Sequence, residues 1–166
     1  ERSAHIALNA VEKARSIIGG RLDTRISTCH LELIHEDDIS RFRELDVPAN
    51  FTLHWNGFGY LTGWKEPIGA ERAARRFSIQ ALIDDGATVS YSSDTTGMTR
   101  LYRTSPFFSM QIGHNRQEVG AAPNSEILPP ISERLALVDI VNGYTQGGAY
   151  QLRYEDTLGS IEVGKE

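Results

Sequence analysis

The sequence is short of basic residues, with 17 Lys and Arg against 22 Asp and Glu among its 166 residues and a formal net charge of −5. Nucleic-acid binding needs a clustered basic surface, so this balance argues against a nucleic-acid partner. The sequence also lacks any run of about 18 apolar residues, the length that a membrane-spanning helix requires. We therefore expect neither nucleic acid nor a membrane as a partner.

Cysteine is almost absent, because Cys29 is the single one. No internal disulfide can form, so disulfides do not indicate the compartment. No signal peptide is visible, and we expect a cytoplasmic protein. The 40% of hydrophobic and 23% of charged residues are typical of a globular chain, and the length suits one domain.

The spacing of apolar residues predicts helices that alternate with short strands. Residues 4–18 carry apolar side chains three or four apart and end at two glycines, Gly19 and Gly20. Further helices are expected at 35–45, 70–85, 105–117, 133–142 and 146–153, the last two with Ser132 and Thr145 as N-caps. Strands are expected at 25–34, 49–54, 88–92 and 159–163.

This alternation favours parallel β/α units with right-handed crossovers, an α/β fold. Three strands between helices are too few to close a barrel, which takes eight strands and about 250 residues. The chain is therefore either a small open sheet or part of a barrel. Because a helical pattern starts at residue 1 and the end falls within an apparent strand, we expect a piece of a longer protein.

Three polar residues fall at the carboxyl ends of the expected strands: His30, His54 and Asp94. Ligands gather at this edge in β/α folds, and imidazole and carboxylate groups bind zinc and similar divalent metals. The alternative is that the histidines are structural and that Asp94 caps a turn. No His-x-His or His-x-x-x-His motif supports a metal site by spacing alone.

Residues 55–69 form a long, glycine-rich loop whose aromatic side chains either line a pocket or plug the end of the sheet: Trp55, Phe58, Tyr60 and Trp64. Three arginines follow it, Arg72, Arg75 and Arg76, which we expect on a solvated helix face. One of them is a candidate to bind a substrate carboxylate in bidentate fashion. Cys29 and His30 are neighbours on a strand and point to opposite faces, which argues against a nucleophile pair.

Several segments resemble the amidohydrolase superfamily, and most closely amidohydrolase family 3, the YtcJ-like metal-dependent hydrolases. The similarity runs in order over nearly the whole chain, through residues 28–33 (TCHLEL), 69–73, 82–87, 92–94, 132–135, 144–150 and 155–165. The string GSIEVGK near the end is common across amidohydrolases and does not indicate the substrate.

The resemblance implies the last part of a distorted (β/α)8 TIM barrel, strands six to eight with their helices, over residues 1–158. Residues 159–166 would begin the strand that leads to an adjoining β-sandwich. His30 matches the strand-six metal ligand, and Asp94 matches the strand-eight aspartate that binds metal and takes the proton of the attacking water. His54, Trp55 and Arg72 would lie on the substrate side.

The family's remaining metal ligands would precede Glu1. We therefore expect a fragment of a metal-dependent hydrolase that cleaves the C–N bond of a non-peptide amide or related acyl compound with metal-activated water, zinc being the expected metal. The isolated chain should be inactive, hold no tight metal and self-associate. The alternative is a non-catalytic α/β interaction or regulatory domain that has kept the scaffold.

Overall fold

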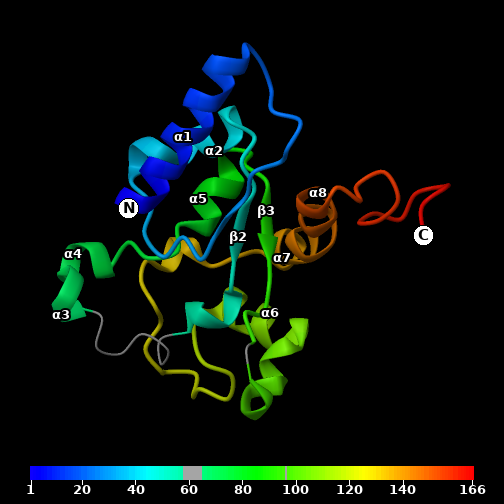
Figure 1. Ribbon diagram of the computed structural model, residues 1–166. Coiled ribbons are helices and arrows are strands. Elements are labelled where there is room, and N and C mark those ends of the chain that lie inside the picture. The colour runs from blue at the N-terminus through cyan, green and yellow to red at the C-terminus, as the bar shows by residue number, and fades with distance from the viewer. Residues whose placement is uncertain (58–64, 96) are drawn as a thin grey trace.

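Three parallel strands form the sheet of the computed structural model, which describes residues 1–57, 65–95 and 97–166. They are β1 (Thr28–Cys29), β2 (Ala49–Phe51) and β3 (Val89–Tyr91), in the order β1-β2-β3. Cys29 pairs with Asn50, and Asn50 with Ser90. Because both pairings are parallel, all three carboxyl ends lie at one edge, toward which the arrowheads of β2 and β3 point (Figure 1).

Helices surround this sheet (Figure 1). The α-helices are α1 (Arg2–Ile18), α2 (Ile39–Glu44), α3 (Lys65–Ile68), α4 (Ala70–Ala73), α5 (Ile79–Asp84), α6 (Pro106–Asn115), α7 (Leu137–Asn142) and α8 (Gly148–Leu152). Shorter 3-10 segments are η1 (Glu36–Asp38), η2 (Leu53–Asn56), η4 (Met98–Thr104) and η5 (Ile131–Glu133), and a π-helical segment, η6 (Gly143–Gly147), joins α7 to α8. Among the described residues, no helix is long and apolar enough to cross a membrane.

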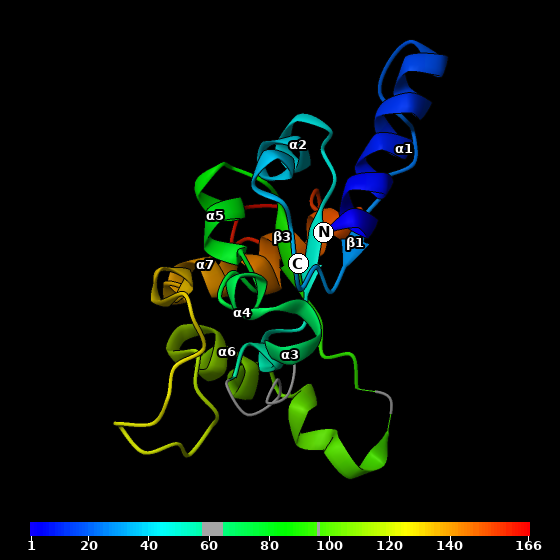
Figure 2. The ribbon, with the colours of Figure 1, turned by 90° about the vertical axis from the view of Figure 1, so that its left-hand side faces the viewer.

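The two faces of the sheet differ in polarity because side chains alternate along each strand. Ala49, Phe51, Val89 and Tyr91 are buried in one hydrophobic core together with side chains of α1, α2 and α5. The opposite face carries polar groups: the Asn50 amide donates to Ser90 Oγ at 2.9 Å and to Gln151 of α8 at 3.1 Å. In Figure 1, α5 lies to the left of β3 and α7 to its right, and Figure 2 gives the view turned by 90°.

The run from α7 to α8 packs directly against β3, the last strand in the sheet order. A Cβ atom built on Gly147 would lie 1.9 Å from the carbonyl oxygen of Val89, and one on Gly143 would lie 2.2 Å from the Tyr91 ring. Only glycine permits so close an approach of backbone to strand. This helical segment therefore covers β3, one of the ways in which proteins protect a strand at the edge of a sheet.

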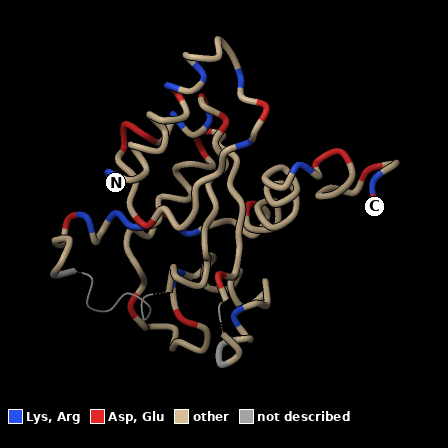
Figure 3. The backbone as a smooth tube through the Cα atoms, in the orientation of Figure 1, with Lys and Arg blue, Asp and Glu red and all other residues tan. Residues whose placement is uncertain are grey.

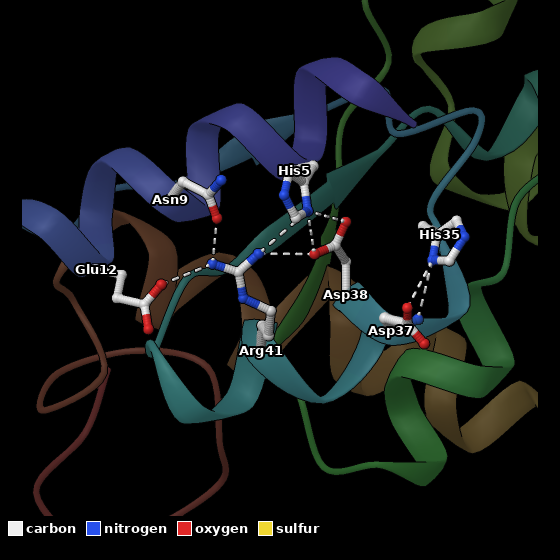
Figure 4. Close-up of polar contacts among 7 residues, drawn as sticks. All are labelled: His5, Asn9, Glu12, His35, Asp37, Asp38 and Arg41. Atoms are coloured by element: carbon white, nitrogen blue, oxygen red, sulfur yellow. Dashed lines mark hydrogen bonds and ion pairs between the residues drawn. The ribbon is translucent and has the colours of Figure 1, made fainter.

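Polar contacts tie α1 to the segment η1–α2, as Figure 4 shows. The buried carboxylate of Asp38 pairs with His5 Nδ1 at 2.9 Å and accepts from Arg41 at 2.7 Å. Arg41 also donates to Asn9 at 2.7 Å and to Glu12 at 3.0 Å. Along the described part of the trace, positive and negative residues are interspersed (Figure 3).

The strands end earlier than expected because the backbone leaves the extended region. The strand expected at 25–34 is reduced to β1, since His30 (φ 69°) and Leu31 (φ 46°) are left-handed. The strand expected at 49–54 becomes β2 followed by the 3-10 segment η2. The prediction of a strand at 159–163 is wrong: positive φ angles at Gly159 and Gly164 turn the tail, which Lys165 ties to the Glu155 carbonyl at 2.7 Å.

Two helix predictions also need correction. The single helix expected at 70–85 is interrupted between α4 and α5, where Phe77 is left-handed (φ 56°) and its amide donates to the Glu32 carbonyl at 3.0 Å. Thr145 is not an N-cap, because it lies within the continuous run from α7 to α8 and its hydroxyl donates to the Val141 carbonyl at 2.8 Å. Ser132 lies in η5, and α7 starts only at Leu137.

Candidate site at the carboxyl edge of the sheet

The three residues singled out in the sequence follow the three strands at the same edge of the sheet. His30 comes directly after β1, His54 lies in η2 just after β2, and Asp94 follows β3. The segment η2 packs against α6, which lies beyond the carboxyl ends of the strands (Figure 1). The expectation that three different strands deliver polar groups to one end of the sheet is therefore met by the topology.

Aromatic contacts bring His30, Trp55 and His54 together. The imidazole of His30 stacks on the indole of Trp55, with ring centroids 4.8 Å apart and planes inclined by 14°. His54 meets the same indole edge-on at 6.3 Å and 86°. Trp55 therefore lies between two candidate histidines that come from neighbouring strands. Of the other aromatic residues of the expected loop, Phe58, Tyr60 and Trp64 lie outside the described residues.

The three candidates differ in exposure. His54 is buried, His30 is partly buried and Asp94 is exposed. Asp94 shares the left-handed backbone of His30, with φ 43°. An exposed carboxylate at the end of a strand is accessible to a small molecule, whereas the His54 ring is held within the protein.

The remaining histidines have structural partners. His5 Nδ1 pairs with Asp38, His35 Nδ1 accepts from the Asp37 amide at 3.3 Å, and His114 Nδ1 lies 2.8 Å from the Leu135 carbonyl. By contrast, Nδ1 of His30 is buried and has no hydrogen-bond partner among the residues that the structure describes. A buried polar atom without a partner is costly and calls for an explanation, such as an ion that is not part of the structure.

A divalent metal fits the donor chemistry at this edge but not a complete ligand set. Imidazole and carboxylate are ordinary ligands of zinc, and the orphaned nitrogen of His30 suits such a role. Within the described ranges, however, no group of three or more His, Cys, Asp and Glu side chains is placed to hold an ion. The described residues thus offer His30 and Asp94 as candidates for part of a metal site.

The three arginines of the sequence have different environments. Arg72 is exposed, and its Nε lies 3.9 Å from the Glu1 carboxylate, to which Arg75 donates at 3.0 Å. Arg76 is buried and donates through Nε to the Ala73 carbonyl at 3.2 Å, so the expectation of a solvated face is wrong for it. The break at Phe77, between α4 and α5, accompanies this burial.

Glu32 is a neighbour of this edge that sequence reasoning missed. Burial raises the pKa of its carboxyl group, while electrostatic interactions with Arg76 and His30 act in the opposite direction. Glu32 is brought near Arg76 because its backbone carbonyl accepts the amide of Phe77. A helix continuous from 70 to 85 would not make this contact, so the periodicity of the sequence gave no signal for it.

Two cavities lie away from these residues. One of about 390 Å³ is lined by Thr88 and Val89 at the start of β3, by η6 and by the C-terminal tail. Another of about 310 Å³ is lined by residues 21–26 before β1 and by Asp46 and Val47 before β2. Both adjoin the amino ends of the strands, so neither coincides with the carboxyl edge that carries His30 and Asp94.

The fold places the protein in the class of parallel α/β proteins, with its candidate site residues at the carboxyl edge of the sheet. The model described as "Amidohydrolase family", that of amidohydrolase family 3, matches residues 2–166. Because the match spans nearly the whole chain, the protein belongs to this family. The resemblance seen in the sequence is confirmed.

Solved structures agree in fold. An uncharacterised metal-dependent hydrolase from Pyrococcus furiosus matches with a TM-score of 0.72 at 23% identity, over 99% of this chain and 30% of that one. Another from Pyrococcus horikoshii OT3 gives 0.72 at 20% identity, with the same two shares. The chain thus spans about 30% of the length of these hydrolases and shares part of their fold. None of the curated proteins compared with the chain matches it.

Proposed function

We propose that the chain is part of a metal-dependent hydrolase that cleaves a C–N bond of a small non-peptide amide. The observation that carries the proposal is the placement of His30, His54 and Asp94 after three parallel strands at one edge, in a chain of the amidohydrolase family. The names of the two solved hydrolases support metal dependence for those proteins, and we extend it to this one.

In this proposal His30 and Asp94 hold a divalent ion, for which zinc is our candidate. When bound, such an ion lowers the pKa of a water molecule toward ~7 and polarises the carbonyl group of the substrate. Asp94 accepts the proton of the attacking water on its exposed carboxylate and passes it to the leaving nitrogen. His54, Trp55 and Arg72 lie on the substrate side in this proposal, and the exposed guanidinium of Arg72 suits a carboxylate or other anionic group.

The remaining ligands come from outside this chain in our proposal. A stable zinc site takes three or four protein ligands, and His30 and Asp94 supply two. The isolated chain is therefore expected to be inactive. The alternative is a non-catalytic α/β domain that has kept the scaffold, and the metal content of the full-length protein distinguishes the two.

Replacement of Asp94 by asparagine tests the proposal. The amide keeps the shape of the carboxylate but has no basicity, so Asp94→Asn should lower kcat of the full-length hydrolase by about 10²–10⁴-fold. Asp156→Asn, a change at another exposed aspartate, is the matched control and should leave kcat unchanged. If Asp94 only caps a turn, asparagine serves equally well, because both residues are good caps.

His30→Ala separates the two proposed roles. It should act mainly through metal affinity, so added metal should restore part of its activity, whereas Asp94→Asn should not respond to metal in this way. Near-normal turnover of Asp94→Asn on a substrate of the full-length protein would refute the catalytic assignment.

A further inference from the structure

Trp55 stacks on His30, a contact with no role in the proposed chemistry so far. Its indole ring lies parallel to the imidazole of His30, with centroids 4.8 Å apart and an inclination of 14°. Trp55 belongs to η2, which follows β2, whereas His30 follows β1. The stack is therefore a tertiary contact between neighbouring strand ends and not a consequence of local sequence.

The backbone alone holds His30 weakly. β1 contains only two residues, and His30 and Leu31 both leave it with left-handed backbones. Within the described part of the chain, His30 Nδ1 has no hydrogen-bond partner, so no such bond from these residues orients the ring. Trp55, in contrast, is packed against the hydrophobic core, and it offers a fixed flat surface on which the imidazole rests.

We propose that Trp55 is a positioning residue for His30, an inference that rests on the proposed role of His30 as a metal ligand. The lone pairs of an imidazole lie in the plane of its ring. The stack fixes this plane parallel to the indole, and the indole covers one face of the ring. A metal ion then binds His30 in the plane of the imidazole ring, and Trp55 sets the orientation of this plane.

The stack also favours the metal-bound state. An imidazole that donates electrons to a cation becomes electron-poor, and an electron-poor ring is attracted to the electron-rich face of an indole. Aromatic pairs of this kind change an equilibrium by about two- to tenfold beyond the area they bury. Loss of the indole should therefore weaken metal binding at His30 by a factor in this range.

Nuclear magnetic resonance of the full-length protein with ¹⁵N-labelled histidine measures this effect without an activity assay. The ring signal of His30 is identified as the one missing in His30→Ala. Titration with zinc chloride gives an apparent dissociation constant at His30 for the wild type, Trp55→Phe and Trp55→Leu. His35, an exposed histidine beside Asp37, is the internal control.

We expect Trp55→Leu to raise the dissociation constant at His30 by about three- to tenfold, while Trp55→Phe stays within about twofold of the wild type because it keeps a flat ring. The His35 response should be the same in all three proteins. Equal affinities of the wild type and Trp55→Leu would refute the positioning role. An absence of any zinc response at His30 in the wild-type full-length protein, which carries the complete ligand set of the proposal, would instead refute the proposed function.

A second measurement needs no substitution and covers the case in which Trp55→Leu does not fold. Nuclear Overhauser contacts between the His30 and Trp55 ring protons should be present in the wild type and should persist at saturating zinc. Their loss on zinc binding would show that His30 leaves the indole to meet the metal, and this outcome overturns the inference.

Discussion

A single methyl group added at Gly147 should destabilise the fold strongly. Gly147 ends the π-helical segment η6, and a Cβ there would lie 1.9 Å from the Val89 carbonyl oxygen and 3.0 Å from its carbon. These are backbone atoms of β3, which cannot rotate away as the end of a flexible side chain does. Overpacking costs about 1–3 kcal/mol, and a clash with rigid backbone places Gly147→Ala at the upper end of this range, at ~3 kcal/mol.

The neighbouring glycine provides the control. Gly148 is also helical, with φ −64°, but the nearest atom to its Cβ position is 3.8 Å away. Alanine is favoured over glycine inside a helix by up to about 1 kcal/mol, so Gly148→Ala should be neutral or stabilising. Two adjacent and chemically identical substitutions are thus expected to differ by about 3–4 kcal/mol in the free energy of unfolding.

Urea unfolding followed by far-ultraviolet circular dichroism measures both variants against the wild type. If the slopes are equal, the shift of the midpoint reports the change in the free energy of unfolding. A Gly147→Ala protein as stable as Gly148→Ala would refute the reasoning. It would mean that the run from α7 to α8 does not rest on β3 in solution.

Two further predictions concern pH and association. Burial acts to raise the pKa of Asp38, but the hydrogen bonds from Arg41 and His5 outweigh it and hold that pKa below its ordinary value. The stability that Asp38 contributes is thus complete above about pH 4 and is lost as the pH falls through the lower pKa of the folded state. The urea midpoints of the wild type and Asp38→Asn should therefore converge toward pH 2. A difference between the two midpoints that stays constant with pH would contradict this. The isolated chain should also self-associate, because β1 is an edge strand and three apolar side chains of α7 are exposed, Leu137, Val138 and Val141. Light scattering that shows a clean monomer at high concentration would contradict this and favour a self-contained sheet.

The order of elements was predictable because it depends on local patterns. The apolar spacing of residues 4–18 matches α1, and the glycine after it, Gly19, adopts the left-handed conformation expected at a helix end, with φ 80°. Alternation of helices and strands correctly indicated three parallel strands. These features follow from side-chain periodicity and from glycine, which act within a few residues.

The missed features depend on contacts between distant residues. The alanine-rich pattern of 70–85 favours one helix, yet the bond from Phe77 to Glu32 interrupts it and removes Arg76 from solvent. Thr145 shows that the residue type alone does not predict an N-cap. A threonine that suits an N-cap also fits inside a helix, where its hydroxyl donates to the carbonyl four residues earlier. The stack of His30 on Trp55 requires the register of β1 on β2, which no local pattern contains.

The turn after β1 has a strained backbone at His30, the residue proposed to bind the metal. A non-glycine residue in a sparsely populated backbone conformation costs about 1–3 kcal/mol, and His30 and Leu31 adopt the left-handed region in succession. Leu31 is buried in the hydrophobic core, and burial of a leucine side chain contributes about 1.5–3 kcal/mol, enough to offset much of that cost. The sharp turn lets Leu31 enter the core while His30 stays at the carboxyl edge against Trp55. Because a glycine at position 30 would make the same turn with less strain, the presence of an imidazole there argues that the side chain itself is needed.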